Sequence, residues 1–238
     1  MNPHVSVRPW LTAAVLLLLS PLALAETIAV IGTGEVGKAL GPEFAAQGHT
    51  IVYGSRDPDR ADIKVLIAKT GDEASAMLPA EAVEHADIVV LAVPGMLVSE
   101  IVLGLGDLSE KIIIDPTNPL IWSETGIEFG VETSNAEIIQ GLAPAAYVVK
   151  AFSTLNWRDM VEPESSGGPI SIPLTGNSDT AKRAVASIIE KMGLEPIDVG
   201  PVENSHWVEG MTMLYLRNRR ASDRPGFDFH LRKVAPTE

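Results

Sequence analysis

The most constraining feature of this chain is segment 27–37, which reads TIAVIGTGEVG. Its first five residues are rich in β-branched side chains and carry no charge, which is typical of a buried parallel strand. Gly32, Gly34 and Gly37 follow in the spacing G-x-G-x-x-G, and a helical pattern comes next. A strand, a glycine-rich turn and a helix in this order predict a dinucleotide-binding unit.

Each glycine of the turn has its own expected role. Gly32 allows the tight turn, Gly34 lets a pyrophosphate approach the backbone, and Gly37 lets the helix pack closely on the strand. The helix N-terminus adds free N–H groups and a positive dipole end. A turn without a ligand is the alternative, but three glycines weaken a turn unless something uses the space. We therefore expect six residues to bind the cofactor: Gly32, Thr33, Gly34, Glu35, Val36 and Gly37.

The end of the second predicted strand, 50–53, indicates which dinucleotide binds. Sites that prefer NAD place an acidic residue here to hold the ribose 2′-hydroxyl, whereas this chain has Ser55 and Arg56. A guanidinium can bond a 2′-phosphate in a bidentate manner, and a serine hydroxyl can add one hydrogen bond. The sequence therefore predicts NADP. Arg60 could reach the same phosphate or pair with a neighbouring aspartate, and both alternatives stay open.

The rest of the chain alternates predicted strands and helices, as in a doubly wound α/β fold. We expect a Rossmann-type, mostly parallel sheet with a small C-terminal helical part. Residues 26–152 would form the NADP-binding domain, and 153–238 would complete the fold and supply an acceptor or dimer surface. Further strands are expected at 87–93, 111–115, 147–152, 170–174 and 196–199, and helices at 58–69, 79–85, 96–105, 180–192 and 203–216.

Ligands of such folds lie outside the carboxyl ends of the strands. Ala92, Val93 and Pro94 end one predicted strand, so they should line the cofactor. Asn118 follows the next strand, where its amide could hold a carboxamide or simply begin a turn. Lys150, near the end of strand 147–152, is expected to keep its ammonium group in water rather than act as a base.

Several motifs together resemble those of NADP oxidoreductases that use the deazaflavin coenzyme F420. The combination of GSRDP, NPL and KAFST is more specific than the glycine motif, and the resemblance covers nearly everything after the first 25 residues. The same module also serves as the NADPH domain of membrane metalloreductases. The motifs are IGTGEVG (31–37), YGSRDP (53–58), ADIVVLAVP (86–94), IIIDPTNPL (112–120), VVKAFSTL (148–155) and GPVENSHWVEGM (200–211).

The resemblance implies hydride transfer between NADP(H) and a small-molecule acceptor such as a deazaflavin or flavin. It also implies that Ala151 approaches the nicotinamide and that residues 152–154 face the acceptor. In this family the motif usually reads K-A-F-N-T, whereas this chain has Ser153 in place of the asparagine. That difference bears on contacts with the acceptor.

The sequence shows no nucleophile–base pair, carboxylate pair or metal cluster, and it contains no cysteine. Hydride transfer between two rings needs alignment rather than a protein acid or base, because the cofactors carry the chemistry. We therefore expect an NADP-dependent oxidoreductase without a catalytic side chain. A non-catalytic NADP-binding or sensing module is the alternative. The net charge of −13 argues against nucleic acid as a partner.

The first 25 residues follow the pattern of a secretory signal peptide. A weakly basic start precedes an apolar run over 10–25, which is shorter than the roughly 20 residues needed to span a bilayer. Ala23, Leu24 and Ala25 form a cleavage site before Glu26. We therefore predict export, to the periplasm or the medium. Because an exported NADP site is unexpected, a membrane tether and a cytoplasmic protein with a later start also stay open.

The last predicted helix carries an apolar stripe at helical spacing. This stripe is expected to pack in the core or to contact a second subunit. The chain could therefore form a homodimer through this helix. The basic stretch 217–238 is expected to be a solvated tail by default. The stripe consists of Trp207, Val208, Met211, Leu214 and Tyr215.

Overall fold

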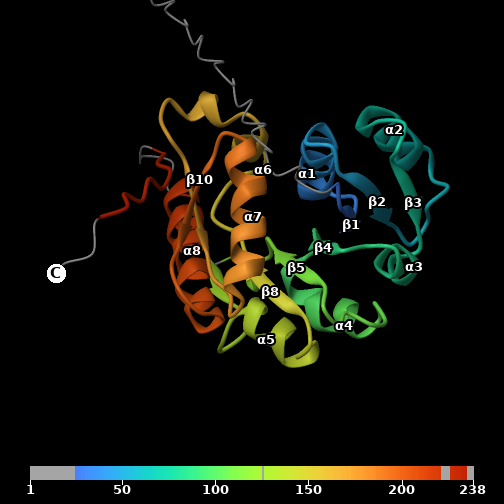
Figure 1. The fold of residues 1–238 in the computed structure, drawn as a ribbon. Helices are drawn as coiled ribbons and strands as arrows, with labels where there is room; N and C mark the ends of the chain where they lie inside the picture. The colour runs from blue at the N-terminus through green and yellow to red at the C-terminus, as the bar shows by residue number, and fades with distance from the viewer. Residues whose placement is uncertain (1–24, 125, 221–225, 235–238) are drawn as a thin grey trace, which may run out of the picture.

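A six-stranded parallel sheet forms the centre of the computed structural model, which describes residues 25–124, 126–220 and 226–234 (Figure 1). The strand order is β3-β2-β1-β4-β5-β8. From β1 the chain adds strands first on one side of the sheet and then, from β4, on the other, as in a Rossmann fold. The predicted fold class is therefore confirmed. The strands are β1 (Thr27–Ile31), β2 (Thr50–Gly54), β3 (Ser75–Met77), β4 (Ile88–Leu91), β5 (Ile112–Asp115) and β8 (Tyr147–Lys150).

Two layers of helices cover the sheet because its strands are apolar on both faces. In β1, Ile28 and Val30 face one layer, while Ala29 and Ile31 face the other. The first layer contains α1 (Glu35–Ala46), α2 (Ala61–Thr70), α6 (Trp157–Val161) and α7 (Asp179–Lys191). The second contains α3 (Pro79–Glu84), α4 (Val98–Leu103) and α5 (Asn135–Leu142).

The C-terminal region extends the sheet through one antiparallel bridge, between Lys150 and Thr175. Beyond this bridge, β9 (Ser171–Leu174) pairs in parallel with β10 (Glu195–Asp198). The segment 226–234 lies beside β9, where the carbonyl of Phe229 accepts a hydrogen bond from the Ser171 amide. This part of the basic stretch is therefore packed on the fold, and its prediction as a solvated tail was wrong.

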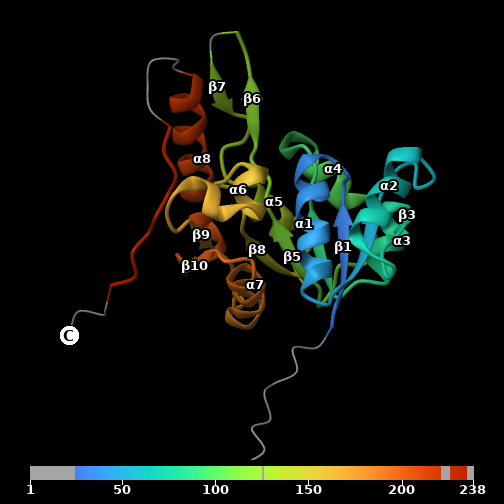
Figure 2. The ribbon, with the colours of Figure 1, turned by 90° about the horizontal axis from the view of Figure 1, so that it is seen from above.

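The long helix α8 (Ser205–Arg220) runs beside a hairpin of β6 (Leu120–Trp122) and β7 (Ile127–Phe129), as Figure 2 shows. The sequence did not predict the hairpin, α5, α6 or β3. It placed the buried face of α8 correctly only in part, since Val208 and Tyr215 are buried. Trp207 and Leu214 are 72% and 58% exposed, while Glu209 and Thr212 are buried.

The predicted signal peptide lies almost wholly outside the described residues, which begin at Ala25. Within the described ranges, no helix has the length and apolar character that a membrane crossing requires. Three short 3-10 turns complete the fold: η1 (Gly95–Leu97), η2 (Pro163–Ser166) and η3 (Val202–Asn204).

We predict opposite stability effects for two helical glycines. A Cβ on Gly41 of α1 would overlap the buried ring of Tyr53, with ring carbons only 2.7 and 2.8 Å away. Gly41→Ala should therefore lower the free energy of unfolding by about 1–3 kcal/mol, as overpacking does. A Cβ on Gly141 of α5 meets nothing within 4 Å, so Gly141→Ala should raise it by about 0.5 kcal/mol.

Urea unfolding of the two variants and the wild type measures both effects. Equal stability of the two variants would contradict the packing of Tyr53 against α1.

Candidate dinucleotide-binding site

The glycine turn between β1 and α1 has the shape that the sequence predicts. Gly32 adopts a φ of +102°, and a Cβ there would collide with the carbonyl oxygen of Ala92. A Cβ on Gly37 would collide with the carbonyl oxygen of Gly32. Both positions therefore need glycine so that β1, β4 and α1 can approach one another closely.

Gly34 has a different environment, because it faces open space. A Cβ at this position would meet no atom within 4 Å, and the residue is exposed. Gly34 is also the N-cap of α1, and no side chain caps this helix end. The first N–H groups of α1 and its positive dipole end are therefore available to a phosphate group.

A pocket of about 230 Å³ lies directly beside this turn. It brings together the start of α1, the end of β4 and the loop that follows β5. Six of the predicted cofactor residues line it, namely Gly34, Glu35, Val36, Ala92, Val93 and Pro94, together with Leu91, Pro116 and Thr117. The carboxyl ends of three parallel strands thus meet at one site, as expected for this fold.

The loop after β2 presents one unengaged guanidinium group. Arg56 is exposed and has no hydrogen-bond or ion-pair partner among the described residues. The buried hydroxyl of Ser55 exchanges hydrogen bonds with the backbone of Asp57, at 3.1 and 3.2 Å, and so shapes the loop. Arg60 instead forms a bidentate pair with Asp62, at 2.5 and 3.0 Å. Of the two arginines, only Arg56 is ready for a phosphate without breaking another contact.

Unpaired polar groups gather where the loop after β5 meets the turn after β8. Asn118 donates its amide hydrogen to the carbonyl of Ser153 at 3.0 Å, which fixes the side chain. The Oδ1 atom of Asn118 and the hydroxyls of Ser153 and Thr154 are buried without a partner among the described residues. Because buried polar atoms are normally satisfied, these three are candidates for contact with a ligand.

Ala151 does not lie where the resemblance implies. Its side chain is fully buried and belongs to the apolar core on the α1 face of the sheet. The chain turns sharply at Phe152, whose φ is +62°, and the Phe152 ring packs 6.3 Å from that of Phe44. Direct contact between Ala151 and a nicotinamide is therefore not supported by this conformation. Ala151 contributes to the core rather than to the surface of the site.

The prediction for Lys150 was wrong, because its ammonium group is completely buried. Its Nζ atom bonds Asp115 at 2.8 Å, Glu209 at 2.6 Å and the carbonyl oxygen of Thr117 at 2.6 Å. All three donors of the ammonium group are thus satisfied. The sequence analysis missed Asp115 and Glu209 as partners, since both lie far from Lys150 along the chain.

Burial and charge act against each other in this cluster. Burial raises the pKa of Glu209 to about 7; Lys150 opposes this rise, and the charge of Asp115 adds to it. Burial alone would lower the pKa of Lys150, but the two carboxylates raise it above its ordinary value. Lys150 therefore stays protonated, while Glu209 titrates near neutral pH.

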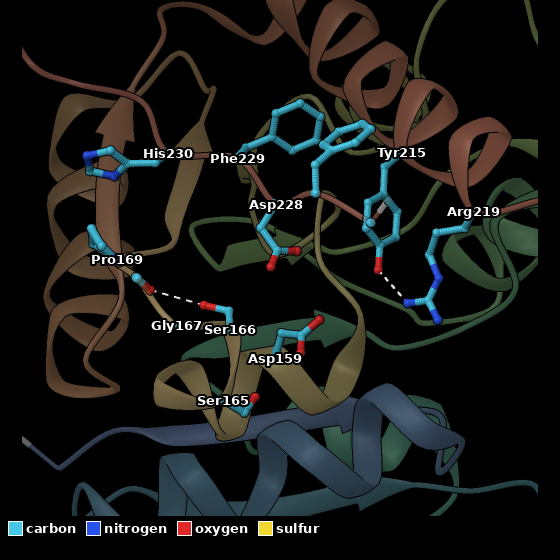
Figure 3. A pocket seen from close by; sticks show the side chains of 13 residues that line it. Asp159, Ser165, Ser166, Gly167, Pro169, Tyr215, Arg219, Asp228, Phe229 and His230 are labelled. Carbon is cyan, nitrogen blue, oxygen red and sulfur yellow. Dashed lines mark hydrogen bonds between the residues drawn. The ribbon is translucent and has the colours of Figure 1, made fainter. Parts of the chain in front are cut away.

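A second, larger pocket of about 670 Å³ shares no lining residue with the first (Figure 3). It lies between α6, α8 and the segment 226–230. Arg219 donates a hydrogen bond to the Tyr215 hydroxyl at 2.8 Å on one side. Burial and the nearby charge of Asp228 raise the pKa of Asp159 on another side. The described residues contain no cluster of metal-ligating side chains here or elsewhere.

Comparison with known proteins agrees with this geometry. Residues 27–119 match the family model described as "NADP oxidoreductase coenzyme F420-dependent". A crystal structure assigned as an F420-dependent NADP reductase from an Arthrobacter species has a TM-score of 0.80 and 29% sequence identity. The match covers 88% of this chain and 100% of that one.

Two kinds of curated relative share the same region. Metalloreductase STEAP3 of Rattus norvegicus is 27% identical over 194 residues, or 81% of this chain, but the match covers only 37% of that protein. The chain thus spans little more than a third of this metalloreductase. The F420-dependent NADP reductase of Methanothermobacter thermautotrophicus is 30% identical over 220 residues, which cover 81% of this chain and 90% of the reductase. The chain therefore belongs to the family of coenzyme F420-dependent NADP oxidoreductases.

Proposed function

We propose that this chain binds NADPH and transfers its hydride to a flavin-like or deazaflavin acceptor. The observation that carries the proposal is the combination of an open glycine turn with an unpaired guanidinium at the end of β2. Gly34 leaves room for a pyrophosphate at the N-terminus of α1. Arg56, in the loop after β2, would meet the 2′-phosphate that distinguishes NADP from NAD. Membership of an NADP oxidoreductase family supports the same donor.

The residues at the site would bind and orient the cofactor rather than exchange protons with it. When bound, the reduced nicotinamide supplies the hydride. The N-terminus of α1 would hold the pyrophosphate, and Arg56 would hold the 2′-phosphate. The unpaired Oδ1 of Asn118 would accept a hydrogen bond from the carboxamide, since its amide nitrogen is already engaged with Ser153. Fixing the ring in this way favours hydride transfer by alignment.

The hydroxyls of Ser153 and Thr154 are the groups best placed to meet an acceptor. Both are buried and unpartnered among the described residues. The relatives differ in the acceptor that their names imply, since one is an F420-dependent reductase and another is a metalloreductase. The match covers 90% of the first and 37% of the second. This difference supports a ring acceptor over a metal chelate.

A sensing module that binds NADP without turnover is the alternative function. It would be favoured if a bulky side chain of α8 filled the acceptor space. Trp207 does not do so, because 72% of its surface is exposed to solvent. Thr212, rather than a large apolar side chain, contacts the Ser153 carbonyl from α8.

Stopped-flow oxidation of bound NADPH tests the function directly. Purified protein is titrated with NADPH and NADH, and the tighter complex is mixed with a deazaflavin, a flavin or a ferric chelate. We expect fast oxidation by a ring acceptor. Tight NADPH binding with no oxidation by any of the three would support the sensing module instead.

Export from Glu26 is a separate proposal. The carbonyl of Glu26 accepts a hydrogen bond from the Thr50 amide at 3.1 Å, so cleavage after Ala25 would leave the whole of β1 in place. Intact-mass analysis of protein recovered from its native host should give a chain that begins at Glu26. A chain that keeps Met1 in the membrane fraction would point to a tether.

Loss of Arg56 should change the choice of dinucleotide. Arg56→Ala removes a charge-assisted bond to the 2′-phosphate, so NADPH binding should weaken by about 1.5–3 kcal/mol while NADH binding stays nearly unchanged. Titration calorimetry with both dinucleotides measures the difference. Arg60→Ala is the matched control and should cost less, because Asp62 already holds Arg60. An equal loss for NADPH and NADH in Arg56→Ala would refute the assignment.

A side chain at position 34 should block both dinucleotides without unfolding the protein. Gly34 has a φ of −77°, which valine can adopt, and its Cβ direction is open. Gly34→Val should therefore change stability by about 1 kcal/mol or less and abolish measurable binding of NADPH and NADH alike. The same calorimetry and a thermal melt decide this. Undiminished binding would show that the pyrophosphate lies elsewhere.

A further inference from the structure

The buried cluster around Lys150 holds more negative than positive charge. One ammonium group faces two carboxylates, Asp115 and Glu209, and none of the three side chains reaches solvent. Both oxygens of Asp115 are engaged, by Lys150 and by Thr117. The Oε2 atom of Glu209 has no partner among the described residues. Glu209 is therefore the member of the cluster that can take up a proton without losing an existing bond.

This cluster connects the elements that surround the candidate site. Glu209 belongs to α8, and its Oε1 atom also accepts a hydrogen bond from the Asn135 amide at the start of α5, at 3.0 Å. The Asn135 side chain then bonds the Thr117 hydroxyl at 2.7 Å and the Gly95 carbonyl at 3.0 Å. One network thus joins η1, the loop after β5, β8, α5 and α8.

One turn beyond Glu209, α8 contacts the proposed acceptor side. The Thr212 hydroxyl donates a hydrogen bond to the Ser153 carbonyl at 2.8 Å. The same carbonyl accepts the amide of Asn118 at 3.0 Å. Thr212 and Asn118 thus hold the same carbonyl, which links α8 directly to the turn at Ser153.

We propose that Glu209 is a positioning residue that holds α8 and Thr212 against the turn at Ser153 and Thr154, and that loss of its proton loosens this contact. The proposal rests on the proposed function only where it names the acceptor side. Glu209 acts through Lys150 and α8, and it contacts neither substrate nor cofactor.

The charges around Glu209 give the direction of the effect. Glu209 faces Asp115 on β5 and Lys150 on β8. On α5 it faces the backbone amide of Asn135, and the nearby Glu137 carboxylate is bonded by Ser134. On α8 itself, His206 bonds the Thr133 carbonyl. The pKa of Glu209 is about 7 when α8 is docked, against an ordinary 4.5. Because the docked state binds the proton more tightly, docking is strongest at low pH and weakens as the pH rises through 7.

Hydrogen exchange in the cofactor-free protein tests this directly. Protection of the α8 amides, corrected for intrinsic rates, should fall about thirtyfold between pH 5.5 and pH 8 in the wild type. Glu209→Gln keeps an oxygen for Lys150 and for the Asn135 amide but cannot ionise. Its protection should therefore stay flat over the same range. The exposed Glu203 provides the control, and Glu203→Gln should behave as the wild type does.

Asp115→Asn gives a second, independent check. It removes a charge that raises the pKa of Glu209, so the midpoint should move to lower pH. If Glu209→Gln shows the same pH dependence as the wild type, or if the wild type shows none, the proposal is wrong. NADPH binding is measured by a separate titration. Failure of the proposed role of Glu209 can therefore be told apart from failure of the proposed function.

The pH dependence of the hydride-transfer rate is a second measurement, and a purely structural role of Glu209 would not change it. With any active acceptor, the single-turnover rate of the wild type should fall as the pH rises through 7, while the Kd for NADPH barely changes. Glu209→Gln should keep its rate at pH 8. A parallel fall in both proteins would overturn the link between Glu209 and the acceptor side.

Discussion

The ammonium group of Lys150 joins the nucleotide-binding half of the molecule to its C-terminal half. Burying a charge is costly unless every donor is satisfied and the geometry is good. Here the partners come from the end of β5, the following loop and α8. Removing the ammonium group would leave two carboxylates in the core without a counter-charge, whereas removing one carboxylate would leave Lys150 paired with the other. The requirement to complete this pairing therefore fixes α8 against the strand ends that also form the site.

The nucleotide side of the site could be predicted from sequence because its determinants are local. The strand, the three glycines and the first turn of α1 lie within eleven consecutive residues, 27–37, and the loop at Ser55 and Arg56 follows the next strand. Local signals were also present for α5, which the sequence analysis missed. Ser134 and Glu137 have the S-x-x-E spacing of a helix start, and the Ser134 hydroxyl accepts a hydrogen bond from the Glu137 amide and donates one to its carboxylate.

The acceptor side could not be predicted in the same way, because its contacts join distant segments. Glu209 reaches Lys150, and Thr212 reaches Ser153, across nearly sixty residues of chain. The apolar spacing of the last helix identified Val208 and Tyr215, which are buried, but it also included the exposed Trp207 and Leu214 and missed the buried Glu209 and Thr212. Hydrophobic periodicity cannot reveal a face that packs through an ion pair. Phe152 likewise combines a left-handed backbone conformation with a long-range ring contact to Phe44, and neither can be read from local sequence.

These two kinds of construction suggest how one donor site can serve several acceptors. The glycine turn is closely packed, because the backbone approaches at Gly32 and Gly37 leave no room for a side chain. The proposed acceptor side instead involves α8, whose Thr212 hydroxyl bonds the Ser153 carbonyl. Relatives named as F420-dependent reductases and as metalloreductases share this region. In the proposed arrangement, the donor and the acceptor would contact different elements, so the acceptor surface could differ between relatives while the contacts to NADPH stay the same.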